Sequence, residues 1–495
     1  MRLQGRRRAT AALLGVLLAA AFAPAPAGSA PRGSAAPPVR VAAGHAAGPH
    51  IEVSALRPQP VGHAAPPVRS GGYAHRVYLA KLTNKGAFAA TDDQLSAAVD
   101  QVLERWLVEA DGGIASFRRH GGVHPFATDT DCQDGTKVWR EAAAVWPHVD
   151  FNRNGNHLVV LAPPGCDFGI GTVGKSLASG GEVEVRYDPH YFTQDLMHEL
   201  GHNFGLQHAD ARVCAPSCRL VHYADHYSFM GASIYGGYTP PALESIARSQ
   251  LGIAQTCELP AVQLVSGQPA LTATYDVFAR TSDTGTRGLR VRDPASGQRY
   301  WIDWRSHAGR DAQAPYAVAA HTALPGTTGT YAAGIVIERR VRPGGDTEVL
   351  SYPHGRGVAF AWPAGQQYTT PDGALAVLVD SIGAHSAHVT VTLTDAHADG
   401  SAQLKTQRGN VVVRGPVRAG ETVTAVPQGW TQRSCFRYRW FAGGTPIRGA
   451  RASTFTVPAA LAGAWLSVRV TGQRPGYAPL QARSEPRLIR NPVTG

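Results

Sequence analysis

Two kinds of hydrophobic spacing alternate along the chain between residues 73 and 257. Apolar positions at helical spacing follow short apolar runs and precede others. One helix is expected after Thr91, which forms a capping box with Gln94, and others over 137–146 and from about Thr193. This alternation predicts an α/β domain built from a mixed sheet plus helices.

The short apolar runs of this region predict strands. RVYLAKL, from Arg76, and GIASFRRH are two of them, and HLVVLAP, from His157, is so apolar that it predicts a strand in the middle of a sheet. EVEVRYD, from Glu182, alternates apolar residues with charged ones. Charges on one face are typical of an exposed edge strand, so we expect this strand at the edge of the sheet.

Beyond residue 257 the helical spacing disappears. Runs with period-two alternation, among them GLRVRD, RYWIDWR and GVAFAW, are separated by Gly, Pro and Asp. They predict an all-β, sandwich-like domain over 258–397. The pattern YRWFAGGTPIRGARASTFTVP within 398–495 resembles the immunoglobulin-like repeats of secreted bacterial wall proteins, which implies a small β-sandwich. The chain is therefore expected to be multidomain.

Aromatic residues in the two β regions offer candidate binding surfaces. Trp301 and Trp304 are three positions apart in one expected strand, so they face opposite sides, and one of them is a candidate exposed residue. Tyr438 and Trp440 share one strand face. Core packing is favoured for this pair over stacking on a sugar.

The first 30 residues have the features of a secretory signal peptide. Four arginines precede an apolar run over 11–23, which is too short to span a bilayer, and small residues suited to cleavage follow. A Pro- and Ala-rich linker or short propeptide is expected over 31–72. The formal charge of +11 would fall to +7 without the signal peptide. Arginine-rich composition of the whole chain explains this charge better than a specific anionic partner does.

Six cysteines remain after the signal peptide, all of them at or beyond Cys132. An even number in an exported chain favours disulfide bonds, but the pairing stays open among about 15 possibilities. Cys214 and Cys218 form a close pair, for which a disulfide is favoured over zinc binding. Cys435 is either free or bonded to a cysteine of another domain.

The segment HELGHNFGLQH, from His198 to His208, carries the strongest chemical signal. His198 and His202 are four residues apart and share one face of a helix, where they can hold one metal ion. Gly205 can adopt positive φ, end the helix and bring His208 back to the metal. Three imidazoles leave a fourth zinc position for water, which Glu199 is placed to activate for attack on a peptide carbonyl.

A second signal follows in YADHYSFMG, from Tyr223 to Gly231. With this pattern, HELGHNFGLQH resembles the extended motif of the metzincin zinc peptidases, and most closely that of the gametolysin family. The resemblance covers about 72–257. It implies endopeptidase activity with Zn²⁺ as cofactor, Met230 beneath the metal, and pairing of the substrate with the expected edge strand.

Some positions depart from the family pattern. A tyrosine that supports the transition state in some metzincins follows the methionine, whereas Tyr223 and Tyr227 precede it here. Tyr227 is a weak candidate for that role, and a core position is favoured. His222 and His226 are interpreted as ordinary polar residues, not ligands. No cysteine precedes the domain, so a cysteine-switch propeptide is not expected.

The segment GIGTVGKS, residues 169–176, matches the phosphate-loop pattern of nucleotide-binding proteins. A helix should begin at its Lys-Ser end, but SGGEVEV follows at once and breaks any helix. We therefore interpret the segment as a glycine-rich connection between strands that borders the active site.

The sequence thus predicts a secreted zinc metalloendopeptidase that acts as a monomer on protein or peptide substrates, with no nucleic-acid partner and no membrane span. Cell-wall polymers are a further candidate partner. The alternative is a cell-wall or matrix binding protein whose zinc domain is structural. The intact Glu199 favours the enzyme, because a structural metal site does not need it.

Overall fold

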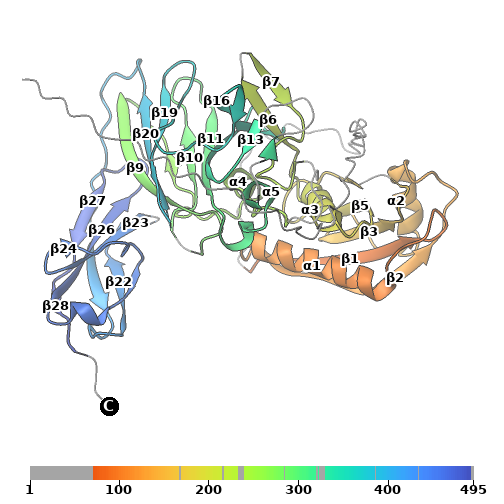
Figure 1. The fold of residues 1–495 in the computed structure, drawn as a ribbon, viewed down its shortest axis with the longest axis horizontal. Coiled ribbons are helices and arrows are strands. Elements are labelled where there is room, and N and C mark those ends of the chain that lie inside the picture. Colours follow the sequence, from red (N-terminus) through yellow and green to blue (C-terminus); the bar gives the residue numbers. More distant parts are fainter. Residues whose placement is uncertain are drawn as a thin grey trace, which may run out of the picture. The chain divides into compact units, whose positions relative to one another are not determined.

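The computed structural model describes residues 71–491, except 167–168, 215–216, 232–238, 284, 319–320, 323–328, 385 and 433. The expected signal peptide and the linker as far as residue 70 lie outside these residues. The described part of the chain is mostly β structure, arranged in several sheets (Figure 1). In this part no helix is long and apolar enough to cross a membrane.

The first sheet has the strand order β2-β1-β3-β5-β4. Its strands are β1 (Tyr73–Leu82), β2 (Ile114–Phe126), β3 (Asn156–Ala162), β4 (Gly169–Gly171) and β5 (Gly181–Arg186). All neighbours pair in parallel except β4, which runs antiparallel to β5. The prediction of a central strand in HLVVLAP is confirmed, since β3 is buried from His157 to Ala162.

Helices cover both faces of this sheet because buried side chains alternate along β1 and β3. Val77 and Val159 belong to the core that contains α1 (Asp92–Ala110) and α3 (Phe192–Asn203). Their neighbours Tyr78 and Leu158 pack with α2 (Gly135–Ala143) instead. The capping box of α1 is present as predicted, with Thr91 and Gln94 bonded in both directions.

The prediction of an edge strand in EVEVRYD is wrong. β5 lies between β3 and β4, and the carboxylate-bearing Glu184 is buried. The alternation of charge does not mark a solvated face here, because the side chain of Glu184 is turned into the protein. The edge of the sheet next to β5 is formed by β4, a strand of three residues that is too short and too glycine-rich to stand out in the sequence.

Two further sheets form a sandwich in the middle of the chain. One has the order β7-β6-β15-β14-β11-β10-β8 and the other the order β18-β19-β20-β9. Side chains of both share one core, with Ile302 and Ile337 from the first and Val377 and Val389 from the second. The strands of the first are β6 (Ala209–Cys214), β7 (Cys218–Val221), β8 (Ala261–Val262), β10 (Leu289–Arg292), β11 (Arg299–Arg305), β14 (Gly334–Arg340) and β15 (Thr347–Leu350). Those of the second are β9 (Ala270–Phe278), β18 (Gln367–Thr369), β19 (Leu375–Ile382) and β20 (Ser386–Thr394).

The seven-stranded sheet joins segments on both sides of the predicted domain boundary at residue 257. β6 pairs in parallel with β15, and β7 pairs with β6. A smaller sheet and short helices complete this region: β12 (His321–Thr322), β13 (Gly329–Tyr331), β16 (Tyr352–His354), β17 (Gly357–Ala359), α4 (Ser245–Leu251), η1 (Gly309–Asp311) and α5 (Pro315–Val318). The boundary itself stays a prediction. The strands that directly follow the histidine motif nevertheless share one sheet with strands of the predicted all-β region over 258–397, the central β region.

The two tryptophans of β11 face opposite sides, as the sequence predicted, but neither is exposed. Trp301 packs with Ile246 and Leu259, and Trp304 lies in the sandwich core. The suggestion of an exposed tryptophan as a binding surface is therefore wrong, because β11 is an inner strand covered on both faces.

The C-terminal region has its own core around the fully buried Trp440. Tyr438 is partly buried against the same core, in agreement with the packing interpretation. Its elements are β21 (Asn410–Arg414), β22 (Thr422–Gln428), β23 (Cys435–Ala442), β24 (Thr445–Pro446), β25 (Thr454–Thr456), η2 (Ala459–Leu461), β26 (Trp465–Gln473), β27 (Leu480–Arg483) and β28 (Arg487–Leu488).

Three disulfide bonds account for all six cysteines. They join Cys132 to Cys166, Cys214 to Cys218 and Cys257 to Cys435. The predicted disulfide in the close pair is present. Cys435 reaches another region of the chain, which was one of the two alternatives left open.

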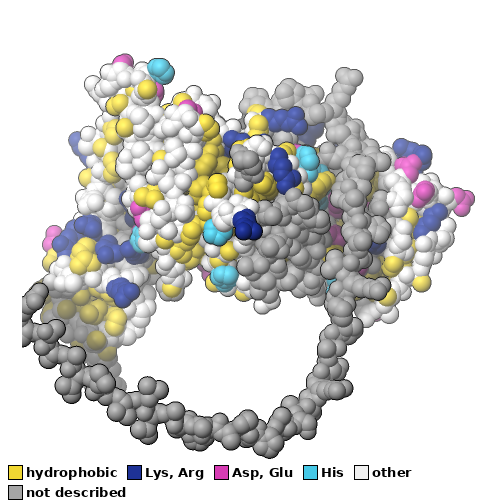
Figure 2. All heavy atoms as spheres, turned by 45° about the horizontal axis from the view of Figure 1, so that its top comes forward, with side chains coloured by type: hydrophobic (Ala, Val, Ile, Leu, Met, Phe, Trp, Pro, Cys, Tyr) yellow, Lys and Arg dark blue, Asp and Glu magenta, His cyan; other side chains and the backbone are white. Residues whose placement is uncertain are grey.

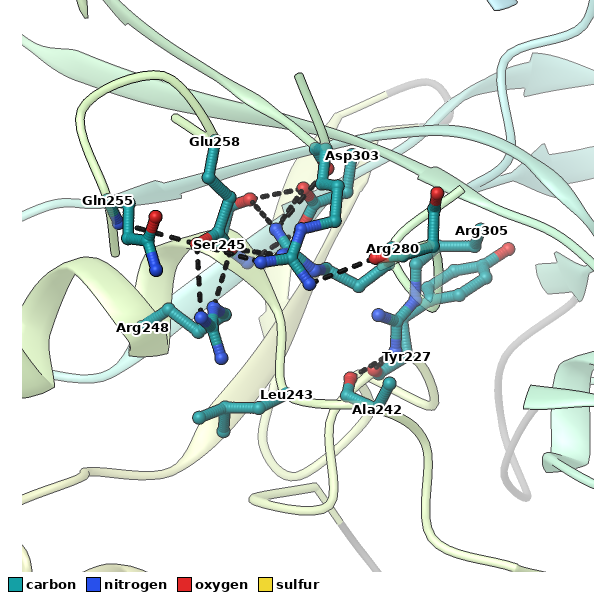
Figure 3. Close-up of polar contacts among 12 residues, drawn as sticks. Tyr227, Ala242, Leu243, Ser245, Arg248, Gln255, Glu258, Arg280, Asp303 and Arg305 are labelled. Carbon is teal, nitrogen blue, oxygen red and sulfur yellow. Dashed lines mark hydrogen bonds and ion pairs between the residues drawn. The ribbon is translucent and has the colours of Figure 1, made fainter. Parts of the chain in front are cut away.

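A buried cluster of ion pairs joins α4 to the central β region (Figure 3). The Glu258 carboxylate lies within ion-pair distance of Arg248, Arg280 and Arg287. Beside it, Asp303 of β11 accepts a hydrogen bond of 2.7 Å from the backbone N–H of Ser245. Burial alone would raise the pKa of Glu258, but the surrounding arginines lower it to about 2.

The Glu258→Gln substitution tests this cluster. Removing one partner of a buried ion pair leaves uncompensated charge, so the free energy of unfolding should fall by about 3–5 kcal/mol at neutral pH. Because the pKa of Glu258 is lower in the folded protein than in the unfolded one, its contribution is complete above about pH 4–5 and is lost as pH falls towards 2.

Denaturant titrations of wild type and variant between pH 7 and pH 2 measure both effects. The difference between the two proteins should shrink as pH falls. The exposed pair of Arg153 and Asp150 supplies the control, and Arg153→Gln should change stability little. An equal effect of both substitutions would contradict the role of the buried cluster.

Candidate metal centre

Helix α3 carries two of the three predicted ligands and ends where the sequence predicted. It runs from Phe192 to Asn203, and Gly205 follows with φ of +92°. The chain reverses there, with the Leu206 N–H donating to Gly201 O at 3.0 Å. This positive φ is the conformation that glycine adopts without strain, and it turns the chain back towards the helix face.

The reversal brings His208 beside His198 and His202. The Nε2 atoms of His202 and His198 are 3.1 Å apart, and those of His202 and His208 are also 3.1 Å apart. One nitrogen from each ring lies within 4.8 Å of the other two. The predicted ligand set is therefore assembled in space as a group of three histidines.

Two of the rings are held in one orientation by backbone carbonyl groups. His198 Nδ1 donates to Phe229 O at 3.0 Å, and His202 Nδ1 donates to Leu206 O at 2.9 Å. A ring whose Nδ1 carries the proton has a lone pair on Nε2, so these two lone pairs face each other. This arrangement requires either a shared cation or an extra proton on one ring.

Two of the three spacings between ligand nitrogens fit a tetrahedral metal ion. Zinc binds imidazole nitrogen at about 2.0–2.1 Å, which places two ligand atoms of a tetrahedral site about 3.3 Å apart. The observed 3.1 Å between neighbouring Nε2 atoms is close to this value. Two of the three spacings and the orientation of two of the three rings thus meet the requirements of a metal site, and all three ligand atoms lie within 4.8 Å of one another.

Glu199 is buried between α3 and the edge strand β4. A Cβ atom on Gly169 would lie 2.8 Å from Glu199 Oε1, and one on Gly171 would lie 3.0 Å from Oε2. Burial raises the pKa of the Glu199 carboxyl well above its usual range, and the charge of Asp195 adds to the rise. The site therefore combines a metal-binding group with an adjacent carboxyl that holds a proton more readily than usual.

The glycine-rich segment GIGTVGKS packs along α3 and forms no phosphate loop. Gly174 donates from its backbone N–H to His202 O at 2.8 Å, and a Cβ on Gly174 would lie 1.8 Å from Asn203 O. No helix begins at Lys175 or Ser176. The glycines of this segment are required by close contact with the ligand helix, which explains a pattern that also matches nucleotide-binding loops.

A buried chain of polar groups fixes the end of α3 to the sheet. His157 Nδ1 lies 2.9 Å from Asn203 Oδ1, and the Asn203 side chain donates to Thr172 O at 2.9 Å. His157 Nε2 lies 3.0 Å from Nδ1 of the buried His75. Burial lowers the pKa of His157 to about 4, so the His157 side chain is uncharged within this hydrogen-bonded group at neutral pH. No local sequence pattern marks this group, since its members are far apart along the chain.

Met230 lies directly beneath the ligand helix. A Cβ on Gly201 would come within 2.5 Å of Met230 Sδ, so the glycine between the two helical ligands makes room for the methionine. The Met230 carbonyl accepts a hydrogen bond of 3.0 Å from the N–H of Ala209, the residue after the third histidine. The turn that carries Met230 is thereby fixed relative to the metal site.

The tyrosines near the turn have different places. Tyr227 is fully buried, and its hydroxyl donates to Ala332 O at 2.9 Å, which agrees with the favoured core role. Tyr223, by contrast, is only half-buried, and its ring centre lies 4.2 Å from that of His208. Its φ of 58° is unusual for a tyrosine. Tyr223 is therefore a residue of the site, although the sequence distinguishes it only as part of a motif.

The other two histidines near the turn are not in the group of three. His222 is exposed, and its Nδ1 lies 3.2 Å from Asp210 Oδ2. His226 is buried and stacks on Tyr331, with ring centres 4.1 Å apart. Both positions agree with the interpretation of these residues as ordinary polar groups.

Comparisons with known proteins assign no family to the chain and find only weak structural similarity. No family model matches the chain, and no curated protein matches it. Metalloproteinase-II from Bacteroides fragilis is similar with 12% identity and a TM-score of 0.26, over 39% of this chain and 56% of that one. OgpA from Akkermansia muciniphila is similar with 11% identity and a TM-score of 0.25, over 87% and 94%. The chain thus spans little more than half of the first protein, and similarity this weak supports no inference about activity.

Metal analysis of His202→Ala tests the group of three. The imidazole of His202 lies between the other two, so its loss should reduce bound zinc from about one ion per chain to a small fraction of that. Elemental mass spectrometry of the purified protein measures the content. The exposed His222→Ala is the control and should keep the full content. Equal zinc in the two variants would show that the metal binds elsewhere.

Proposed function

We propose that the chain is a secreted zinc-dependent endopeptidase that hydrolyses peptide bonds of extracellular proteins. The observation that carries this proposal is the convergence of three histidine Nε2 atoms beside a buried glutamate on the same helix. The motif resemblance supports the finer assignment to the metzincins and, among them, to the gametolysin type. Three disulfide bonds support an oxidising compartment outside the cytoplasm.

His198, His202 and His208 would hold the zinc ion. When bound, zinc would supply a Lewis acid that polarises the substrate carbonyl and lowers the pKa of water. The remaining chemistry belongs to Glu199. Its carboxylate takes a proton from the water that adds to the carbonyl carbon, and it then passes that proton to the amine as the C–N bond breaks.

The environment of Glu199 suits this proton transfer. A general base works best when its pKa lies near the working pH, and burial raises the pKa of Glu199 in that direction. Contact with the glycines of β4 restricts the carboxylate to a small space beside the ligand helix. A structural metal site has no need for a carboxyl group held in this way.

Strand β4 is the proposed docking edge for the substrate. Its partner β5 lies on one side only, and β4 is the last strand of the sheet. An extended peptide can add to such an edge by main-chain hydrogen bonds. A peptide beside β4 would lie close to Glu199, because Gly169 and Gly171 of this strand contact its carboxylate. This arrangement favours proteins and peptides as substrates.

The binding-protein alternative has weaker support. On the face shown in Figure 2, the Lys and Arg side chains of the described residues occur in several separate groups. A polyanionic wall polymer would be recognised best by a continuous basic surface. The C-terminal region, proposed here as an immunoglobulin-like domain, remains the part in which binding to the cell wall would be sought.

Glu199→Ala is the direct test of the proposed chemistry. The variant should keep about one zinc ion per chain, since Glu199 is not a ligand, and should lose cleavage of a denatured protein substrate by about 10²–10⁴-fold. Glu104, an exposed residue of α1, provides a control in Glu104→Ala, which should cleave at the wild-type rate. Cleavage by Glu199→Ala at the wild-type rate would refute the mechanism.

Gly169→Ala tests the contact between β4 and Glu199. The added methyl group would displace the end of the Glu199 side chain, a flexible group, so the fold should tolerate it. We expect zinc content and the unfolding midpoint to stay near wild type while kcat/KM falls at least about tenfold.

Gly122→Ala in β2 is the matched control. A Cβ on Gly122 has open space around it, so this variant should retain activity. Full activity in Gly169→Ala would mean that the carboxylate does not work from the position seen here.

A further inference from the structure

The third ligand is held by the central β region. The N–H of Thr347 donates to the carbonyl of His208 at 3.0 Å. Burial raises the pKa of the carboxyl of the preceding residue, Asp346, and the nearby backbone N–H of His208 acts against that rise. The His208 carbonyl is therefore bonded to the first residue of β15, and the His208 N–H lies near the carboxyl of the residue just before that strand.

The bond between Thr347 and His208 begins a longer pairing. Directly after His208 the chain becomes β6, which runs parallel to β15 with Ala209 opposite Thr347 and Arg212 opposite Leu350. Glu348 strengthens the pairing, since its carboxylate binds the Arg212 guanidinium at 2.7 Å. The position of His208 is thus set by the register of a sheet that belongs mostly to the central β region.

His208 needs this support more than the other two ligands do. His198 and His202 lie on one helix, so their relative position follows from the helix itself. His208 follows a glycine turn, and a short turn alone leaves several directions open to the chain. A fixed backbone at His208 removes that freedom before any metal binds.

The turn beneath the metal site is held from the same side. Arg305 of β11 donates to the backbone carbonyls of Tyr227 and Ala242 (Figure 3). The Tyr331 hydroxyl donates to Ala224 O. These contacts come from different strands of the central β region and converge on the segment that carries Met230.

We propose that Asp346 and Thr347 are positioning residues of the metal centre, so that the central β region is part of the metal-binding unit and not an appended module. This inference rests on the proposed function, because it concerns the same three histidines. It goes further in assigning preorganisation of the third ligand to residues outside the motif. Residues that orient metal ligands typically account for 10- to 100-fold in metal affinity.

Zinc affinity of the full chain, measured against a competing chelator, tests this assignment. Asp346→Ala removes the carboxyl that lies near the His208 N–H and should weaken zinc binding about 10- to 100-fold. Asp346→Asn keeps an acceptor oxygen at the same place and should bind zinc within about threefold of wild type. Thermal unfolding of each metal-free protein is recorded alongside.

Glu348→Ala is the matched control on the same strand. It removes the ion pair with Arg212 and should lower the unfolding midpoint, but it leaves the bonds to His208 in place and should not change zinc affinity. Wild-type affinity in Asp346→Ala would overturn the inference, as would an equal loss of affinity in Glu348→Ala, since general loosening of β15 would then explain both.

The outcome for wild type separates this inference from the function on which it rests. Wild-type protein that binds no zinc would overturn the proposed function and this inference together. Tight zinc binding by wild type, with no loss in Asp346→Ala, would overturn the positioning role alone.

Discussion

The repulsion between imidazole lone pairs is the constraint on which the metal centre depends. His198 and His202 present Nε2 lone pairs to each other at 3.1 Å because backbone carbonyls occupy their Nδ1 protons. Without a cation or an extra proton on one ring, this arrangement costs free energy that the fold has to supply. The surrounding structure accordingly fixes each ligand by independent means: the helix for two of them, and β15 for His208.

Close packing of glycines provides much of that rigidity. Gly201 admits Met230 beneath the helix, Gly174 admits the helix end, and Gly169 admits the Glu199 carboxylate. In each case the absence of a side chain lets backbone or a functional group approach within distances that a Cβ would forbid. The same property gave the segment 169–176 its likeness to a phosphate loop, so the glycine pattern reflects packing in this protein and not recognition of a nucleotide.

The ligand set could be predicted from the sequence because its geometry is local. Four-residue spacing on a helix and a glycine turn determine where His198, His202 and His208 lie, and no distant contact is needed for the first approximation. The central position of β3 and the capping box of α1 were predictable for the same reason. The predictions that failed depend on neighbours: Glu184 is buried where β4 and the start of α2 lie beside β5, and Trp301 is buried where α4 and Leu259 pack on β11.

The contacts that hold the His208 backbone could not be predicted from the sequence, because they also depend on distant segments. Strand register between β6 and β15 brings together segments far apart in the sequence, and nothing in the local composition around Asp346 marks it as a neighbour of a metal ligand. X-ray absorption at the zinc edge of the full chain tests the central claim most directly. The account predicts three nitrogen neighbours and one oxygen at about 2.0–2.1 Å, whereas sulfur at about 2.3 Å would contradict it.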